Sequence, residues 1–508
     1  MKEEFLKIIY TCTALALILQ ILIDFSIENI ISALITCIIS LIAFTYLFDK
    51  NAYFYRYPIS CLIIFGFNIT NQSGALLYQT LNWTPISFNL NNPIETFFYS
   101  GIELLTLLLA HKLYAQSGFY HAMSRAISTK VINGLGFFKI PSNSMLWTSG
   151  FIGMFAVWQS TGTEINYGDI GGKFMVAFIP FVTAPYLIPF LNRFTVSNKD
   201  SSFKSNLIFL YTFLLIVIAF IKNSRGFFAA PIFTFILIYM LFWVTGYFKI
   251  NKQQLMKFFF WLIPLGFLFY FISGISKAML IVRANREGVS GLTMINDTIS
   301  VFLDPNEIAA YDEMTKYAIN NAYNETYISN SIFARLITIK FDDNMLSYYK
   351  LLTQQDASQL LDISINKIWA ILPAPILNVF ITGFNKTDFE FSIGDAIYSL
   401  VSGTEFSLGG YRTGSIVVHG LILMGPFFYV LLLMFIPIVY SLFDSFYKHV
   451  NGKIFFSPFI LLIAFNIFTF LNGDGLNNIV IDLLRTIPQL MFLYLLFALP
   501  FSILSIKK

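Results

Sequence analysis

The sequence predicts an all-α, polytopic helical membrane protein with about 12 transmembrane helices and one large, mainly helical loop on the outer side of the membrane. Of its 508 residues, 56% are hydrophobic and only 12% are charged, which lies far outside the range of soluble domains. Apolar runs recur whose length, about 17–25 residues, is what a helix needs to cross roughly 30 Å of hydrocarbon. These runs are continuously apolar rather than alternating, which argues against a transmembrane β-barrel.

The predicted spans follow one another with one long interruption. The first run has a short basic flank but no small-residue cleavage site, so we expect a span there rather than a cleaved signal peptide. The predicted spans are 8–23, 29–48, 58–79, 95–114, 145–160, 173–191, 206–221, 227–247, 257–274, 414–442, 455–471 and 480–504.

Charge alternates between successive connectors. Basic residues gather in every second connector, for example 112–139, 193–204 and 249–257, whereas the connector 83–95 contains no Lys or Arg. Because short cytoplasmic connectors carry an excess of Lys and Arg, both termini are predicted to be cytoplasmic. Residues 275–413 are then predicted to lie outside.

This insert divides the chain into a bundle of nine spans (1–274), the large outer loop (275–413) and a bundle of three spans (414–508). Helices are expected over 305–321 and 331–352. The apolar stretch 368–381 contains two prolines and is expected to be interfacial or re-entrant. All three cysteines fall inside predicted spans, so the insert does not depend on disulfides.

Arginines beside apolar spans are the first candidate site residues. Arg225 joins the seventh and eighth predicted spans, and Arg283 and Arg286 follow the ninth, at i and i+3 on one helix face. Guanidinium groups offer paired donors that match phosphate geometry, so these three could clamp an anion. Snorkelling toward the interface, or contact with lipid phosphates in general, is the alternative.

The stretch from Glu405 to His419 leads into the tenth predicted span and contains Arg412. A histidine inside a span is uncommon and suggests a site. His419 could act as a general base or orient a phosphate, or it could be a hydrogen-bonded structural histidine. Glu405 is the other candidate base.

The last predicted span contains Asp482 and Arg485 at i and i+3, which we interpret as a structural ion pair inside the membrane. The adjacent acids Asp342 and Asp343 are interpreted as a solvated face. The sequence has no Gly-rich phosphate loop, HExxH or Asp-x-Asp motif, and no His/Cys cluster with metal spacing. Neither a metal nor a cofactor is therefore expected.

Taken together, the chain resembles the Wzy-type O-antigen and polysaccharide repeat-unit polymerases, which are membrane glycosyltransferases of the GT-C-like group. The resemblance rests on the twelve-span layout with one large late loop, the Asn-Ser-Arg-Gly stretch at 223–226, the pair Arg283 and Arg286, and the Gly-rich entry to the tenth span. It covers most of the chain as architecture. The Arg-x10-Gly element of some members is not evident here.

The resemblance implies a metal-independent glycosyltransferase of the bacterial inner membrane, with its large loop in the periplasm. The glycan chain on undecaprenyl pyrophosphate would be transferred to the terminal sugar of an incoming lipid-linked repeat unit. Arg225, Arg283, Arg286 and Arg412 would hold the pyrophosphate, and Glu405 or His419 would activate the acceptor hydroxyl. Outer-loop tyrosines such as Tyr311, Tyr327, Tyr348 and Tyr349 could stack on sugars or anchor the membrane surface.

The expected partners are the undecaprenyl-pyrophosphate-linked oligosaccharide, membrane lipids and a Wzz-type chain-length regulator, with no nucleic acid. An O-antigen ligase-like enzyme would use the same donor with another acceptor. A lipid-linked oligosaccharide flippase is a further alternative, although the sequence shows no paired half-repeats. A structural scaffold would not need the buried arginines.

Overall fold

The computed structural model describes residues 2–49, 53–160, 174–193, 205–221, 226–247, 274–279, 281–282, 291–317, 323–330, 333–404, 408–450 and 452–505. Within these ranges the chain is mostly helical, with a single β-hairpin. Seven of the described helices are long and apolar enough to cross a membrane: Phe5–Ile23, Ile27–Phe48, Pro58–Leu81, Pro93–Gln116, Phe174–Leu191, Phe427–Asp444 and Leu476–Ala498. The chain is therefore a helical membrane protein.

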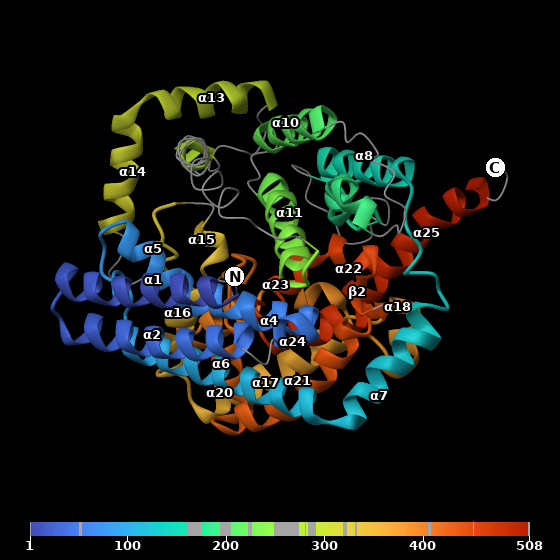
Figure 1. Cartoon of the computed structure of the whole chain (residues 1–508). Coiled ribbons are helices and arrows are strands. Elements are labelled where there is room, and N and C mark those ends of the chain that lie inside the picture. Colours follow the sequence, from blue (N-terminus) through green and yellow to red (C-terminus); the bar gives the residue numbers. More distant parts are fainter. Residues whose placement is uncertain are drawn as a thin grey trace.

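The N-terminal helices form one packed group. Helices α1, α2 and α6 lie side by side, with α4 and α5 against them (Figure 1). Ser26 caps α2 by accepting a hydrogen bond from the backbone N–H of Asn29. The elements are α1 (Lys2–Ile23), α2 (Ile27–Phe48), α3 (Tyr53–Arg56), α4 (Pro58–Asn68), π-helix η1 (Ile69–Ser73), α5 (Gly74–Leu81), α6 (Pro93–Gln116), α7 (Gly118–Ala126) and π-helix η2 (Ile127–Ile132).

The middle of the chain adds α8 (Asn143–Ser160), the 3-10 helix η3 (Ile179–Arg193), α10 (Ser205–Ile221) and α11 (Gly226–Val244). Pro185 and Pro189 interrupt the predicted span 173–191. Proline lacks the N–H that an α-helix interior needs, so this segment adopts 3-10 geometry. The predicted span 257–274 lies outside the described residues except for its last position.

The insert folds as short helices. Helix α17 begins with a capping box between Thr353 and Asp356, and α19 ends at Gly403, which has a φ of 67°. The elements are α13 (Gly291–Leu303), α14 (Pro305–Tyr317), α15 (Phe333–Leu336), α16 (Ile339–Tyr349), α17 (Gln354–Trp369), α18 (Ala374–Phe380), 3-10 helix η6 (Lys386–Phe389) and α19 (Ile393–Ser402).

The C-terminal part differs from the prediction in two places. The span expected over 414–442 is broken at Gly425, whose φ of 57° and ψ of −150° suit only glycine. The span expected over 455–471 is a strand followed by two short helices. The elements are α20 (Ile416–Met424), α21 (Phe427–Asp444), β1 (Tyr447–Val450), β2 (Lys453–Phe456), α22 (Pro458–Leu462), α23 (Ala464–Phe468), α24 (Leu476–Ile481), π-helix η8 (Asp482–Thr486) and α25 (Ile487–Ser505).

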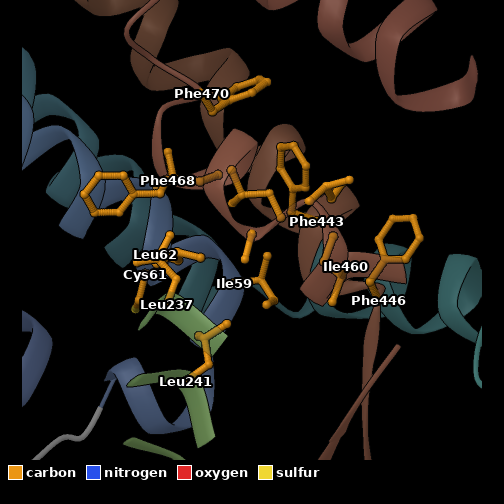
Figure 2. Packing of buried hydrophobic residues seen from close by; sticks show 14 of the residues in the cluster. Ile59, Cys61, Leu62, Leu237, Leu241, Phe443, Phe446, Ile460, Phe468 and Phe470 are labelled. Carbon is orange, nitrogen blue, oxygen red and sulfur yellow. The ribbon is translucent and has the colours of Figure 1, made fainter. Parts of the chain in front are cut away.

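A core of buried hydrophobic residues joins these parts. Figure 2 shows Ile59 and Leu62 of α4 facing Leu237 of α11 and Phe443 of α21. Helix α23 approaches α4 closely at Gly66, where an added Cβ would lie 1.8 Å from the carbonyl oxygen of Phe468. The last helices therefore complete a bundle that the first helices begin. Strands β1 and β2 pair antiparallel, with Tyr447 opposite Phe456.

The second half of the insert packs against the membrane helices rather than forming a separate domain. Helix α16 packs against α6, α20 and η1, and the backbone N–H of Thr338 donates to the carbonyl of Thr70, with 2.9 Å between N and O. Gln79 of α5 donates to the carbonyl of Tyr327 over 2.8 Å. These contacts place part of the insert directly on the membrane helices, and the candidate site lies at that junction.

Candidate functional site

The third span is polar in its middle. Residues Asn68, Thr70, Asn71, Gln72 and Ser73 are all buried there, and 69–73 form the π-helix η1. A π-helix widens the turn and leaves backbone and side-chain groups with partners outside their own helix, and such bulges are frequent at functional sites. Five buried polar residues within six positions of a span require partners or a ligand.

The insert supplies some of those partners. The hydroxyl of Thr338, just before α16, donates to Oδ1 of Asn71 over 2.9 Å. From the C-terminal bundle, Oδ1 of Asn472 accepts from the hydroxyl of Thr70 at 2.9 Å and from Nδ2 of Asn71 at 3.3 Å. Three distant segments of the chain therefore meet at η1.

Helix α16 is fixed to the start of α6 by the buried carboxylate of Asp343, which also forms an ion pair within α16. Nζ of Lys340 lies 2.8 Å from Oδ2 of Asp343, and both side chains are almost fully buried. The same carboxylate accepts hydrogen bonds from the backbone N–H groups of Asn91 and Asn92, at 3.0 and 2.7 Å. Because Asp343 is so held, the neighbouring side chain of Asp342 has a defined position. The interpretation of Asp342 and Asp343 as a solvated face is wrong.

A hollow of about 270 Å³, part of it open to solvent, lies between the insert and the bundle. Its narrow part has room for about one water molecule. Its walls come from η1, α16, the strand-like entry to α20 and the loop before α24. The lining residues are Phe67, Asn71, Thr338, Phe341, Asp342, Gly414, Ser415, Ile416, Val417, Leu471, Asn472 and Gly473.

Asp342 is the acid of this hollow. Burial raises its pKa to about 7, the charge of Asp343 adds to that rise, and a hydrogen bond with the Ser415 side chain opposes it. Its Oδ2 atom has no hydrogen-bond partner among the described residues, and neither does Nδ2 of Asn472 on the opposite wall. A carboxyl group with a pKa near neutral and a free oxygen is suited to take or give a proton.

Glu103 lies in the middle of α6. It is fully buried, and within the described ranges neither of its carboxylate oxygens has a hydrogen-bond partner. The charge of Asp342 acts on it. Neither Glu103 nor the polar run 68–73 is among the site residues predicted from the sequence. A glutamate in the middle of the predicted span 95–114, and five polar residues within 68–73, were the signals that could have revealed them.

His419 lies on α20 and is fully buried. Its Nδ1 accepts a hydrogen bond from the backbone N–H of Leu476 over 3.1 Å, so its Nε2 carries the proton and donates to the hydroxyl of Ser364 over 2.9 Å. That hydroxyl donates in turn to the carbonyl of Leu360. Both ring nitrogens are occupied, which favours the structural alternative for His419 over a general base.

Arg412 is also held by the protein. Its Nη1 lies 3.0 Å from Oδ1 of Asp395, and its guanidinium stacks over the ring of Tyr398, 4.1 Å from the centroid. The buried Asp395 further accepts backbone N–H groups from Gly409, Tyr411 and Arg412 itself. An anion at Arg412 would have to compete with this carboxylate.

A second carboxylate fixes the segment that enters α20. Asp474 accepts hydrogen bonds from the backbone N–H groups of Ile393, Gly394 and Gly414, the last over 2.6 Å. Burial raises the pKa of Asp474, and these hydrogen bonds oppose the rise. Two carboxylates, Asp395 before it in the chain and Asp474 after it, therefore position the segment 414–417 that forms one wall of the hollow.

Asp482 and Arg485 do not form the ion pair expected from their spacing, since the structure records none between them in the described chain. Asp482 hydrogen-bonds instead with the side chain of Thr486. The cause is the π-helix η8, which spans 482–486. In this wider turn the residue that faces position i is not at i+3.

Four predicted site residues, Arg225, Arg283, Arg286 and Glu405, lie outside the described residues. Among the predicted sugar-stacking tyrosines, Tyr327 is buried and its hydroxyl donates to the carbonyl of Ile86 over 2.9 Å. It therefore cannot present a face to a sugar. Tyr348 is half-buried and packs edge-on against Tyr398.

Three comparisons with known proteins found nothing similar to this chain. No protein-family model matches it, no curated protein matches it, and no solved structure matches it.

Proposed function

We propose that this chain is a membrane glycosyltransferase that polymerises polyprenyl-pyrophosphate-linked repeat units, and that the hollow at Asp342 binds the acceptor hydroxyl. The observation that carries the proposal is Asp342 itself. Its side chain is half-buried, its pKa is about 7, its Oδ2 atom is buried without a partner among the described residues, and it lines a space of hydroxyl size. The proposal also draws on the sequence resemblance described above.

In the proposed reaction the acceptor sugar hydroxyl attacks the anomeric carbon of the donor glycan. The new glycosidic C–O bond forms as the C–O bond to undecaprenyl pyrophosphate breaks, and the pyrophosphate keeps the bonding electron pair. Asp342 in its ionised form takes the hydroxyl proton. Asn71, Thr338 and Ser415 surround the same space and would orient the acceptor by hydrogen bonds.

The donor pyrophosphate needs cationic partners, because its charge increases as it leaves. Arg225, Arg283 and Arg286 keep that role in the proposal. Arg412 is assigned a supporting role instead, since its guanidinium already pairs with Asp395 and stacks on Tyr398. It would stabilise the turn that leads to Gly414 and Ser415. The proposed location is the periplasmic face of the bacterial inner membrane, beside a Wzz-type chain-length regulator.

A surface-polysaccharide gel tests the activity. Cells that carry Asp342→Asn are expected to lose the long glycan ladder and keep a single repeat, while the variant still inserts into the membrane. Asp362→Asn is the matched control, because Asp362 is exposed on α17 of the same insert, and it should give a normal ladder. A normal ladder from Asp342→Asn would refute the assigned base. Normal ladders from both Arg225→Ala and Arg283→Ala would refute the pyrophosphate clamp.

A lipid-linked oligosaccharide transporter is the second candidate. The observation that favours it is a fully buried glutamate, Glu103, beside a polar π-helix within the apolar bundle, since ionisable groups at such depths often mark a transport pathway. Deletion of the gene separates the two functions. A retained single repeat indicates a polymerase, whereas loss of all surface glycan indicates a transporter or a ligase-like enzyme.

A further inference from the structure

A set of buried hydrogen bonds joins α2, α4, α6 and α21 near one end of the bundle. The hydroxyl of Tyr46 lies 2.8 Å from Nδ1 of His111, and Nε2 of the same ring lies 3.0 Å from Oγ of Ser60. That hydroxyl oxygen lies 2.7 Å from Oδ2 of Asp444. His111, Ser60 and Asp444 are buried, whereas Tyr46 is half-buried. We call these four residues the His111 network.

The hydrogen bonds indicate an ionised Asp444. Its Oδ1 accepts from the backbone N–H of Ser60 over 3.0 Å, and its Oδ2 accepts from the Ser60 hydroxyl. Donors on both oxygens stabilise the charged form of a carboxylate. Because the hydroxyl proton of Ser60 faces Asp444, Oγ accepts from Nε2–H of His111, and Nδ1 then accepts from Tyr46. Every hydroxyl and ring N–H of the network therefore points toward Asp444.

This arrangement leaves one negative charge in the apolar bundle. The structure records no ion pair with Asp444 in the described chain, and a buried carboxylate without a counter-charge costs several kcal/mol. One added proton makes the network neutral. On Nδ1 it forms an imidazolium that balances Asp444 across Ser60. It can also move on, since the Nε2–H proton passes to Oγ as the Oγ–H proton passes to Oδ2, and no electrons are exchanged.

Aromatic side chains hold His111 in line with its partners. Five tyrosine rings pack around the imidazole, with centroids 5.3–5.9 Å away: Tyr46, Tyr53, Tyr57, Tyr114 and Tyr440. The hydroxyl of Tyr440 is itself fixed by donating to the carbonyl of Leu107 over 3.2 Å. The rings keep water away from the buried imidazole and fix its orientation, so both ring nitrogens stay aligned with Tyr46 and Ser60.

Other titratable groups face the network from the elements packed against it. Those that interact with His111 or Asp444 include a cysteine, a histidine and five tyrosines: Cys61 on α4, Tyr53 on α3, Tyr57 before α4, Tyr114 on α6, His121 on α7, Tyr440 on α21 and Tyr447 on β1. Arg56, which is exposed, acts on Tyr57. Asp444 is the one carboxylate in this described set, so its charge is the one that a proton neutralises.

A proton fits the network better than a metal ion does. A metal ion would have to displace the donors that already occupy both oxygens of Asp444 and Nδ1 of His111. Among the described residues, no group of three or more His, Cys, Asp and Glu side chains is arranged to hold a metal ion. A proton instead uses the existing hydrogen bonds and needs no further ligand.

We propose that the His111 network is a proton-binding site that holds one proton at neutral pH, on either His111 or Asp444. The bound proton removes the buried charge and so stabilises the contacts between α2, α4, α6 and α21. Its half-buried end, Tyr46, lies toward the side that the sequence predicts to be cytoplasmic, and the proton is exchanged with that side. The site is independent of the proposed glycosyltransferase activity, since none of its residues lines the hollow.

Linkage between proton binding and stability provides the first test. The thermal midpoint of the full-length protein in detergent is measured from about pH 7 to about pH 9. The unfolded chain keeps neither proton there, since Asp and His have ordinary pKa values of about 4 and about 6.5. A folded state that still holds one proton therefore loses stability as the pH rises. Asp444→Asn removes the charge, so the wild-type midpoint should fall relative to that of the variant.

The structure accommodates Asp444→Asn. Oδ1 keeps the backbone N–H of Ser60, and the new amide donates to Oγ, whose proton turns to the carbonyl of Tyr57, 3.2 Å away. Asp49→Asn is the matched control, because Asp49 is exposed at the end of α2, and its midpoint should follow the wild type at every pH. A difference between the wild type and Asp444→Asn that stays constant over this range would overturn the proposal.

Histidine-selective ¹⁵N NMR provides the second test, which a merely structural cluster would not pass. The sequence has four histidines, so His111→Gln assigns the signal. We expect the two nitrogen resonances of His111 to move between about pH 6 and about pH 10, as the network loses its proton. Tyr46→Phe should change the Nδ1 resonance. Tyr53→Phe removes a hydroxyl from the ring stacked on Tyr46 and should leave that resonance unchanged.

The wild-type titration stays decisive even if Asp444→Asn fails to fold, because it needs only the variant that assigns the signal. Resonances of His111 that do not move with pH would overturn the proton-binding site. Equal effects of Tyr46→Phe and Tyr53→Phe would overturn the hydrogen-bonded path from Tyr46. None of these results depends on glycan transfer, so the site and the proposed activity stand or fall separately.

Discussion

The hydroxyl of Ser364 lies 2.9 Å from Nε2 of His419, and the backbone N–H of Leu476 contacts the opposite nitrogen at 3.1 Å. The three residues come from the insert, from α20 and from the start of α24. The imidazole therefore links the insert to two elements of the C-terminal bundle. These contacts, rather than its presence inside an apolar helix, indicate a structural role for His419.

His419→Ala should lower the stability of the folded protein by about 1–3 kcal/mol, since it leaves buried polar partners unsatisfied. Ser364→Ala should cost less, and the double variant should cost less than the sum of the two, because both changes break one shared hydrogen bond. Thermal unfolding in detergent measures all three. Additive effects would contradict a shared bond. A changed pH profile of glycan transfer in a well-folded Ser364→Ala protein would restore a catalytic role for His419.

The carboxylate of Asp395 should matter more for stability than the arginine that pairs with it. Asp395→Asn weakens hydrogen bonds from three backbone N–H groups and from Arg412, whereas Arg412→Ala removes the ion pair and the stacking on Tyr398 and leaves the backbone donors to Asp395 in place. We expect Asp395→Asn to cost about 2–4 kcal/mol and Arg412→Ala about 1–2 kcal/mol. Thermal midpoints of the two variants provide the comparison. The reverse order would show that Arg412 has a larger role than its described contacts indicate.

Ionisation of Asp342 should lower the stability of the folded protein as the pH rises. Its pKa is raised from 3.8 to about 7 on folding, so the folded state binds a proton more tightly than the unfolded chain. The cost of ionising Asp342 is absent below about pH 4, grows between about pH 4 and 7, and is complete above that range. Asp342→Asn should therefore be more stable than the wild type at pH 8.

That advantage should shrink as the pH falls toward 5, because the wild-type side chain then becomes neutral as well. Thermal midpoints of both proteins at matched pH values measure the difference. Comparing the two proteins cancels the titration of other groups such as Asp474, whose pKa is also raised. A difference that stays constant from pH 5 to 8 would mean that Asp342 does not titrate in this range.

Gly414 should not tolerate a side chain. An added Cβ would lie 2.2 Å from the carbonyl oxygen of Asp474 and 2.8 Å from its Oδ1, so Gly414→Ala must displace the wall of the hollow. We expect a loss of about 1–3 kcal/mol in stability together with loss of the glycan ladder. Gly118→Ala is the control, since an added Cβ there meets nothing within 4 Å. Unchanged behaviour of Gly414→Ala would mean that this wall can move without consequence.

Several parts of the fold could be predicted from local sequence alone. The apolar runs at 8–23, 29–48 and 95–114 correspond to α1, α2 and α6, because hydrophobic length is a property of one segment. The breaks at Gly425 and at Pro185 also have local causes, but glycine and proline occur in intact spans too, so the sequence did not decide their effect. The run 68–73 was visible as polar, yet its partners Thr338 and Asn472 lie far away in the chain.

The candidate site was largely beyond sequence analysis. Asp342 and Asp343 are adjacent and chemically identical, so their sequence offers no basis for giving them different roles. Their difference arises because Lys340, Asn91 and Asn92 hold one carboxylate, while the other lines the hollow. Likewise, the spacing of Asp482 and Arg485 suggested an ion pair, and the wider turn of η8 removed it.

The sequence by itself determined that this protein is a helical membrane protein with a large insert, since burying apolar segments in lipid requires only that each segment be long and apolar. The tertiary structure decided which polar side chains have hydrogen-bond partners within the protein and which keep a polar atom without one. That distinction depends on partners far apart in the chain. Asp342 meets Ser415, and His419 meets Ser364, only because the insert folds back onto the bundle.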